Sequence, residues 1–207
     1  MISKVKTLLI SISLFIVIFL SSIEFVSFDK KFYNDFQQKE NIKETYGINE
    51  DLKKVNNNLI DFLRTGKVSL INKYFNKKEV AHLIDCYKLF ENGIIIRNVA
   101  AILFVILIFL SKKDLRNNKI LREISNHQII LSILLICFMG FLYFNFDEAF
   151  IKFHHIFFDN KLWLLDPTKD MLIQLMPTNF FIECCIRIFI VYFIMQIAVN
   201  FYLRIEV

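Results

Sequence analysis

Four apolar stretches of about 20 residues each constrain the fold of this chain more than any other feature. They cover approximately residues 7–23, 94–110, 128–146 and 180–203. An α-helix needs ~20 residues to cross ~30 Å of hydrocarbon, and each stretch approaches that length. The chain has 207 residues, of which 56% are apolar, and a soluble domain of this size seldom has so many. We therefore predict an all-α membrane protein, a single membrane domain with four transmembrane helices.

The first stretch follows Lys4 and Lys6, as the apolar core of a signal peptide would. Its apolar run is long for such a core, and the segment Leu20-Ser21-Ser22-Ile23-Glu24 is a poor cleavage site. We therefore predict that this stretch is retained as a membrane span.

The charged residues between the stretches predict the orientation in the cytoplasmic membrane. Residues 111–127 form a short loop in which five basic residues outnumber Asp114 and Glu123, and such loops stay in the cytoplasm. Both chain termini are then cytoplasmic, and residues 24–93 and 147–179 form two outer segments. We expect these segments to build a mostly helical extracytoplasmic cap. The five basic residues are Lys112, Lys113, Arg116, Lys119 and Arg122.

The net charge of +5 comes mostly from this loop and the cytoplasmic terminus with Lys4 and Lys6. We infer that these positive charges set the orientation of the chain in the membrane and contact phospholipid headgroups, and we expect no nucleic-acid partner. The spacing of the four cysteines is not that of a zinc site and does not require a disulfide framework. No cofactor and no particular oligomeric state are predicted.

The first outer segment contains a predicted amphipathic helix over residues 75–90. Asn76 is a suitable N-cap, and His82 lies at the edge of the apolar face. Glu79 and Asp85 lie within one turn of His82, close enough to orient the imidazole. A surface helix that carries one histidine is the alternative. Upstream, residues 28–54 are expected to be extended or loosely structured, and Gly66 is expected to close a short helix.

The second outer segment carries two adjacent histidines that we expect to differ. In a helix continuing from the third span, Phe146, Phe150, Phe153 and Phe157 share a face, and His154 lies at its edge. Partial desolvation would make His154 a usable base near neutral pH, whereas His155 would be solvated. Packing of His154 among aromatic rings in a purely structural role is the alternative.

Trp163 is expected to anchor the chain at headgroup depth, and Asp166 to lie in a turn before Pro167. Arg97 and Arg187 are predicted at membrane depth, where ionisable residues are functional candidates. The structural alternatives are snorkelling of Arg97 to the headgroups and pairing of Arg187 with Glu183. The chain has no glycine-rich phosphate loop, nucleophile elbow or HExxH motif.

Several of these motifs resemble a known family. The chain is similar to the bacterial four-span membrane proteins that include the lipoprotein intramolecular transacylase, Lit, over most of the chain from Leu59 to Phe181. The residues that carry the resemblance are Phe62-Leu63-x-x-Gly66, Glu79-x-x-His82-x-x-Asp85, Phe153-His154-x-x-Phe157-Phe158, Trp163, Asp166, Asp170, Leu172-Ile173 and Pro177.

The resemblance implies an enzyme of Gram-positive bacteria that acts on diacylated lipoproteins at the outer face of the cytoplasmic membrane. Such an enzyme moves the sn-2 acyl chain of the diacylglyceryl-modified N-terminal cysteine onto the α-amino group of that cysteine, which leaves the lyso form. The paired catalytic histidines of the family correspond to His82 and His154. No enzyme nucleophile or cofactor is obligatory for this reaction.

Ester-to-amide transfer within one substrate requires a base for the amine, stabilisation of an oxyanion and an acid for the leaving glycerol oxygen. Our hypothesis is that one of His82 and His154 is the base and the other is the acid, with neither order preferred. Supporting roles are expected for six residues. Glu79 or Asp85 would orient His82, Arg97 or Arg187 would stabilise the oxyanion or hold the carbonyl groups, and Trp163 and Asp166 belong to the shared motifs.

Two other functional classes remain open at this stage. A metal-dependent membrane hydrolase could use Glu79, His82 and His154 as ligands, because Glu-x-x-His on one helix face with a remote histidine is an acceptable set. A non-enzymatic membrane sensor or assembly factor would use its outer segments to bind lipid or a partner protein.

Overall fold

The structure, a computed structural model, describes residues 4–205, and helices are the only regular elements in that part of the chain. The predicted all-α class with four long apolar helices is confirmed. The elements in chain order are α1 (Lys4–Ser27), α2 (Lys30–Lys39), α3 (Ile42–Tyr46), α4 (Leu52–Thr65), the 3₁₀ turn η1 (Val68–Leu70), α5 (Lys77–Leu110), the 3₁₀ turn η2 (Asp114–Arg116), α6 (Asn118–Phe144), α7 (Phe146–Phe157), α8 (Met171–Leu175) and α9 (Thr178–Ile205).

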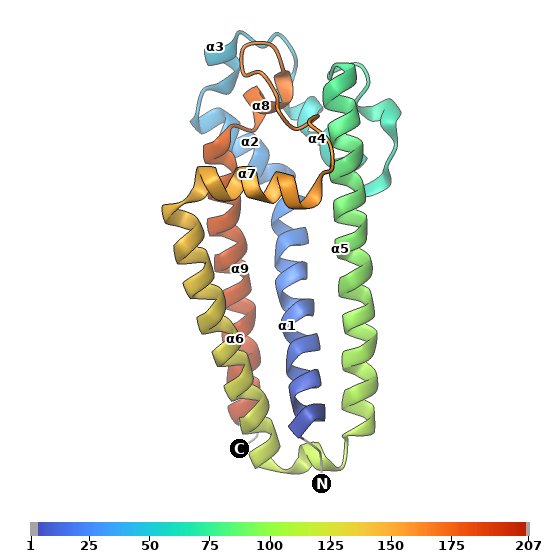
Figure 1. Cartoon of the computed structure of the whole chain (residues 1–207), viewed down its shortest axis with the longest axis vertical. Coiled ribbons are helices and arrows are strands. Elements are labelled where there is room, and N and C mark those ends of the chain that lie inside the picture. The colour runs from blue at the N-terminus through green and yellow to red at the C-terminus, as the bar shows by residue number, and fades with distance from the viewer. Residues whose placement is uncertain (1–3, 206–207) are drawn as a thin grey trace. The chain divides into compact units, whose positions relative to one another are not determined.

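The described residues divide into two compact units, and the first consists of four long helices. This bundle unit comprises the described residues within 1–24, 93–145 and 186–207, so it contains most of α1, α6 and α9 and the C-terminal part of α5 (Figure 1). Ile10 of α1, Leu107 of α5 and Ile124 of α6 share one buried cluster. Tyr192 of α9 packs in a second cluster, and the four helices therefore share one interior.

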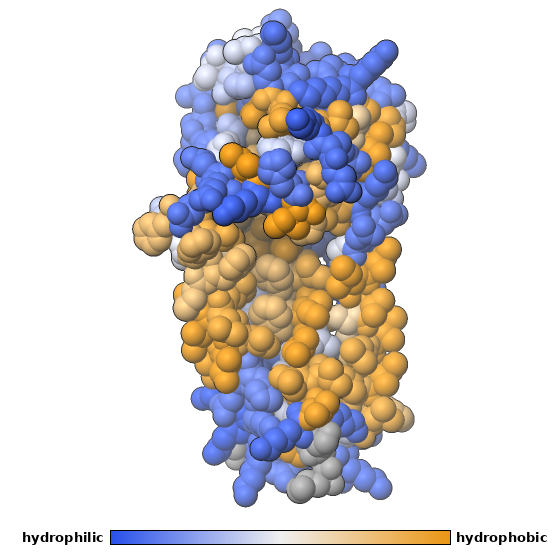
Figure 2. Space-filling view, viewed as in Figure 1, coloured by the Kyte–Doolittle hydropathy of each residue, from blue (hydrophilic) through white to orange (hydrophobic). Residues whose placement is uncertain are grey.

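The outer surface of the bundle unit is apolar. Side chains of Val105, Phe109 and Ile194 are 63%, 76% and 63% exposed. Figure 2 shows hydrophobic residues over the long helices on the face that is drawn. All four helices are long and apolar enough to cross a membrane, and such a surface is stable only against lipid. The protein is therefore an integral membrane protein.

Polar side chains of the bundle unit point inward instead. The side-chain amide of Gln128 donates to the backbone carbonyl of Ser11 at 2.7 Å and accepts from Gln196 at 2.8 Å. The hydroxyl groups of Ser132 and Tyr192 are 2.9 Å apart. Because hydrocarbon offers these groups no hydrogen-bond partner, they satisfy one another across the helices.

The second unit, which we call the site unit, comprises Phe25–Asn92 and Phe146–Cys185. Its core is aromatic, because the buried Phe180 ring stacks on Phe32 at 5.0 Å between centroids and meets Phe36 edge-on at 5.2 Å. Gln37 and Asn56 form a buried reciprocal amide pair, with hydrogen bonds of 3.1 and 2.9 Å. The helices α2 and α4 thus bury their apolar faces in a compact core.

Residues 28–54 are mostly helical, in α2, α3 and the start of α4, and our expectation of extended or loose chain is wrong for these helices. Phe32, Tyr33 and Phe36 have a helical spacing, and all three are buried in the core of the site unit. The side chains of Asp29 and Asp51 accept backbone N–H groups at the starts of α2 and α4. Burial of the aromatic face stabilises short helices that would be marginal in isolation.

The long helices also differ from the expected elements. Residues 75–90 and the second apolar stretch are not separate, because α5 runs unbroken over 34 residues. In contrast, α7 does not continue the third apolar helix. Asn145 ends α6, with its side-chain amide donating to the carbonyl of Phe141 at 2.9 Å, and α7 begins at Phe146. The predicted limits of the four spans are the residues at which each helix enters and leaves the lipid. Helix ends do not define these residues, so the limits stay predictions.

Gly66 closes α4 as expected, with φ +69° in the left-handed region. A Cβ atom at this position would lie 2.9 Å from Cζ of Tyr87 on α5. The glycine therefore serves both the helix end and the close approach of the Tyr87 ring.

Candidate active site

The N-terminus of α5 is fixed by a reciprocal cap. The side-chain oxygen of Asn76 accepts the backbone N–H groups of Lys78 and Glu79 at 2.9 and 3.1 Å. Oε2 of Glu79 accepts the backbone N–H of Asn76 at 2.7 Å. The expected N-cap is confirmed, and Glu79 completes a capping box that sets the register of the helix carrying His82.

Glu79 also links α5 to α8. Its Oε1 accepts the backbone N–H of Leu172 at 2.6 Å, and the carboxylate is 2% exposed. Burial raises the pKa of Glu79, against the two backbone hydrogen bonds, which lower it. Asp170 extends the link, because it accepts from the side chain of Asn76 at 2.8 Å and from the backbone of Asp166 at 2.7 Å.

His82 lies on α5, one turn after Glu79, and is 7% exposed. Phe158 meets its ring edge-on, with 5.2 Å between centroids. Nε2 is 3.6 Å from Sγ of Cys86, whereas Nδ1 is buried and has no hydrogen-bond partner among residues 4–205. Burial and the neighbouring His154 lower the pKa of His82 to about 4, and Asp85 opposes this shift. The ring is therefore neutral at pH 7.

His154 lies on α7 and is also 7% exposed. Its Nδ1 is 2.7 Å from the backbone carbonyl of Phe150, so Nδ1 donates and Nε2 is left as the acceptor. Burial lowers the pKa of His154, although the hydrogen bond to Phe150 acts in the opposite sense. His155 is exposed, and the expected difference between the two adjacent histidines is confirmed.

The two buried histidines lie beside each other within the site unit. Their ring centroids are 6.0 Å apart and the rings are tilted by 35°. Phe158 contacts both, with a centroid distance of 5.6 Å to His154. The segments that carry His82 and His154 are distant in sequence, so packing of the site unit creates the pair.

Residues 158–170 form a loop over the histidines. Trp163 stacks on His154 at 4.7 Å between centroids, and its Nε1 donates to the carbonyl of Asn160 at 3.0 Å. The side chain of Asn160 donates to Asp85 on α5 at 2.8 Å, and Nζ of Lys78 donates to the carbonyl of Leu164. These contacts hold the aromatic cover closed, which explains why both rings are buried.

The two flanking carboxylates do not hydrogen-bond to His82 within the described part of the chain. Glu79 is engaged by backbone N–H groups, and Asp85 binds Asn160. Asp166 stabilises a turn, where the hydroxyl and backbone N–H of Thr168 hydrogen-bond to its Oδ1 and lower its pKa. These residues therefore shape the loop and the helix around the histidines.

The two arginines belong to the bundle unit. Arg97 forms an ion pair with Glu24 and donates to the side chain of Asn98. Glu183, the expected partner of Arg187, is 2.5 Å from Nζ of Lys39. A role of Arg97 or Arg187 toward substrate oxygen stays a prediction.

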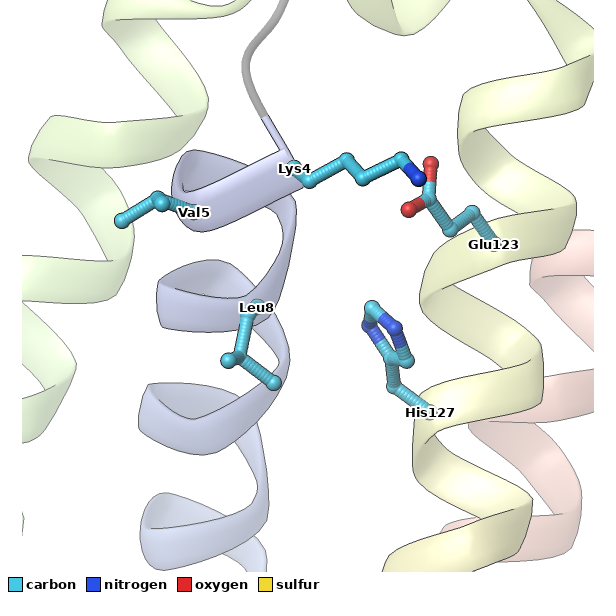
Figure 3. Close-up of a pocket in the computed structure, with 5 residues that line it drawn as sticks. All are labelled: Lys4, Val5, Leu8, Glu123 and His127. Atoms are coloured by element: carbon cyan, nitrogen blue, oxygen red, sulfur yellow. The ribbon is translucent and has the colours of Figure 1, made fainter.

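A hollow of about 380 Å³ lies elsewhere, in the bundle unit. In Figure 3, the side chain of Lys4 on α1 extends toward Glu123 on α6, with His127 one turn further along α6. None of the sequence-predicted site residues lines this hollow.

Sequence reasoning missed Cys86 as a site residue. Its i+4 relation to His82 on one helix was the available signal, because such residues share a helix face. Among residues 4–205 there is no group of three or more His, Cys, Asp or Glu side chains arranged to hold a metal ion. Glu79, His82 and His154 thus do not assemble as a ligand set, since the carboxylate of Glu79 is directed to backbone N–H groups.

Comparison with known families identifies the chain. A family model described as lipoprotein intramolecular transacylase Lit matches residues 8–181. The chain belongs to the Lit family. Members of this family are acyltransferases, and the resemblance inferred from the sequence motifs is confirmed.

Solved structures of a Lit protein have the same fold. The chain is similar to the membrane-integral lipoprotein intramolecular transacylase Lit from Bacillus cereus, with a TM-score of 0.80 and 23% identity over 97% of this chain and 94% of the other. Two variants of that protein, with one histidine replaced by alanine or by arginine, match with TM-scores of 0.81 and 0.79. They are 23% and 24% identical, each over 97% of this chain and 91% of the other. A search of curated protein sequences found no match.

Proposed function

We propose that this protein converts diacylated bacterial lipoproteins to the lyso form by intramolecular acyl transfer. The sn-2 acyl chain of the N-terminal diacylglyceryl-cysteine moves to the α-amino group of the same cysteine. Membership of the Lit family supports the reaction class. The observation that carries the mechanism is the pair of buried histidines with ring centroids 6.0 Å apart.

His154 acts as the base in this mechanism. Its Nδ1–H is held by the carbonyl of Phe150, so Nε2 accepts the proton of the substrate amine. A lowered pKa keeps the imidazole unprotonated near neutral pH, as a base requires. The amine nitrogen then attacks the ester carbonyl carbon, which forms the N–C bond.

His82 acts on the oxygen side of the same substrate. Its neutral ring donates a hydrogen bond to the carbonyl oxygen, which becomes negatively charged in the tetrahedral intermediate. Collapse of the intermediate breaks the bond to the sn-2 oxygen of glycerol, and that oxygen takes up the proton released by the amine. Protons balance, and no covalent enzyme intermediate or added cofactor is needed.

The reaction takes place at the outer membrane-water interface in our proposal. Five basic residues lie between 111 and 127, from the C-terminal end of α5 to the first turns of α6, which favours a cytoplasmic position for that side. The site unit would then lie on the extracytoplasmic face, where diacylated lipoproteins are anchored by their acyl chains. The loop over residues 158–170 must move aside for the substrate ester to reach the two rings.

The experiment replaces each histidine by asparagine in a bacterial host that lacks such an enzyme. The unaltered protein is expected to yield lyso-form N-terminal lipopeptides by mass spectrometry, and His82→Asn and His154→Asn are expected to leave the diacylated form. His155→Asn is the matched control, because His155 is the exposed neighbour of His154. Lyso-form lipopeptides in both single variants, at equal protein levels, would refute the mechanism.

A further inference from the structure

The function of a neutral imidazole depends on which ring nitrogen carries its single proton. His82 is neutral at pH 7, because burial and the neighbouring His154 lower its pKa to about 4. The carboxylates of Glu79 and Asp85 are engaged elsewhere and do not select its tautomer. Among residues 4–205, the polar partner of its ring nitrogens is Cys86, whose Sγ is 3.6 Å from Nε2.

The Cys86 thiol keeps its own proton in this environment. Burial, and secondarily the charge of Asp85, raise its pKa to about 12. A thiol is a weak donor and a weaker acceptor, whereas an unprotonated imidazole nitrogen is a good acceptor. The favoured arrangement at 3.6 Å therefore has the S–H of Cys86 donating to Nε2 of His82.

We propose that Cys86 is a positioning residue of this enzyme, whose thiol donates a hydrogen bond to Nε2 of His82 and so keeps the ring N–H on Nδ1. Nδ1 is buried and has no partner within residues 4–205. A buried N–H group without a partner destabilises the protein. Binding of an acceptor relieves that penalty, so the hydrogen bond to the acceptor is unusually favourable. The carbonyl oxygen of the substrate ester is such an acceptor, and this inference rests on the proposed acyl transfer.

The two histidines are then complementary. The carbonyl of Phe150 holds Nδ1–H of His154 and leaves Nε2 as an acceptor, whereas Cys86 occupies Nε2 of His82 and leaves Nδ1–H as a donor. One ring receives the proton of the amine and the other donates to the ester oxygen. Opposite tautomers in adjacent rings thus match the two polar groups that react.

This role differs from that of a nucleophilic cysteine. A thiol with a raised pKa forms little thiolate at neutral pH, and thiolate is the reactive form. Replacement by serine separates the two roles, because a serine hydroxyl also donates to an imidazole nitrogen but would not take over a thiolate reaction at the same rate. Cys86→Ala removes the donor altogether.

The direct test is the tautomer of His82 in the full-length protein in detergent micelles. With ¹⁵N in the histidine rings, NMR distinguishes protonated from unprotonated nitrogens, and His82→Asn assigns the signals. We expect Nδ1 of His82 to be protonated and Nε2 unprotonated, and the same in Cys86→Ser. Cys86→Ala is expected to shift the population toward Nε2–H. A protonated Nε2 in the unaltered protein would overturn the inference without any variant.

The kinetic test uses a synthetic lipopeptide with an N-terminal diacylglyceryl-cysteine. We expect Cys86→Ala to lower kcat about tenfold with KM unchanged, because one hydrogen bond to the catalytic ring is lost. Cys86→Ser should restore most of the rate, and Cys185→Ala is the matched control for loss of a partly buried thiol. Loss of activity in Cys86→Ser equal to that in Cys86→Ala would indicate a nucleophile and contradict the proposal.

The outcomes also separate this inference from the proposed function. Lyso-form product in both His82→Asn and His154→Asn refutes the two-histidine mechanism itself. Inactive histidine variants together with an unchanged tautomer and kcat in Cys86→Ala refute only the role of Cys86. A thermal unfolding midpoint for each variant excludes loss of folding as the cause.

Discussion

The bundle unit and the site unit arrange the same residue types in opposite ways. In the bundle unit, large apolar side chains such as Val105 and Phe109 face outward, and Gln128 and Gln196 bind each other inside. In the site unit, Phe32, Phe36 and Phe180 form the interior, and most charged side chains face outward. The bundle unit thus has the arrangement that lipid requires, whereas the core of the site unit is the aromatic interior typical of a globular fold.

The histidines show what this difference means for chemistry. His127 of the bundle unit lines an open hollow and lies 3.2 Å from the Ser11 hydroxyl. His82 and His154 are buried among aromatic rings, where desolvation lowers their pKa. The site unit therefore provides two neutral imidazoles that are shielded from water, which is the state that a base and a hydrogen-bond donor need.

The largest expected effect is on activity. His154→Gln should slow lyso-product formation at least about 100-fold, because it removes the proposed general base. His127→Gln should change the rate less than about twofold. Initial rates with a diacylglyceryl-cysteine lipopeptide measure both. Comparable losses in the two variants would mean that the chemistry is not confined to the site unit.

The second effect is on stability against acid. The pKa of His82 is about 4 in the folded protein against 6.5 for an ordinary histidine, so the unfolded chain takes up the proton first. Its contribution is fully present above pH 6.5 and is lost as the pH falls toward 4, by about 3 kcal/mol in total. Thermal unfolding at pH 7 and 4.5 measures this loss. His82→Asn should show a smaller acid destabilisation, and an equal one would contradict the assignment.

The third effect concerns the link between α5 and α8. Glu79→Gln replaces one acceptor oxygen by an NH₂ group that faces a backbone N–H, which should destabilise the site unit by about 2 kcal/mol. Glu148→Gln is the matched control, since Glu148 is exposed and pairs only with Lys152 in the contacts described. Its unfolding midpoint should be unchanged. Circular dichroism during thermal unfolding distinguishes the two.

The smallest effect compares buried amides in the two units. Gln128→Leu in the bundle unit should lower the free energy of unfolding by only about 0.6 kcal/mol. Side-chain amides in a membrane also find hydrogen-bond partners in the unfolded reference state. Asn56→Leu in the site unit should cost about 2 kcal/mol, because Gln37 is left without its amide partner in a buried core. Unfolding in mixed detergent micelles gives both values. A larger loss for Gln128 would reverse the comparison.

The features that the sequence predicts correctly are those with local causes. Apolar length predicts the four long helices, the spacing of Asn76 and Glu79 predicts the cap of α5, and Gly66 predicts the end of α4. The burial of His154 follows from the helical period of the neighbouring phenylalanines. Each of these depends on a few adjacent residues, so no knowledge of the tertiary fold is needed.

The features that it misses depend on distant partners. The helices of residues 28–54 are stabilised by packing against Phe180, which a local polar sequence does not reveal. Spacing alone places Glu79 or Asp85 beside His82, but the donors to Glu79 are backbone N–H groups, one of them on Leu172. The predicted headgroup position of Trp163 stays a prediction, but its stacking on His154 depends on the folded loop and has no local sequence signal.

That stacking has a practical consequence, because Trp163 is the only tryptophan in the chain. Its indole lies 4.7 Å from the His154 ring, a distance at which a protonated imidazole quenches indole emission more strongly than a neutral one. All tryptophan fluorescence of the protein therefore arises beside His154, the base in our proposal. Emission intensity would follow proton uptake by His154, and its wavelength would follow loop opening, without any label added to the molecule.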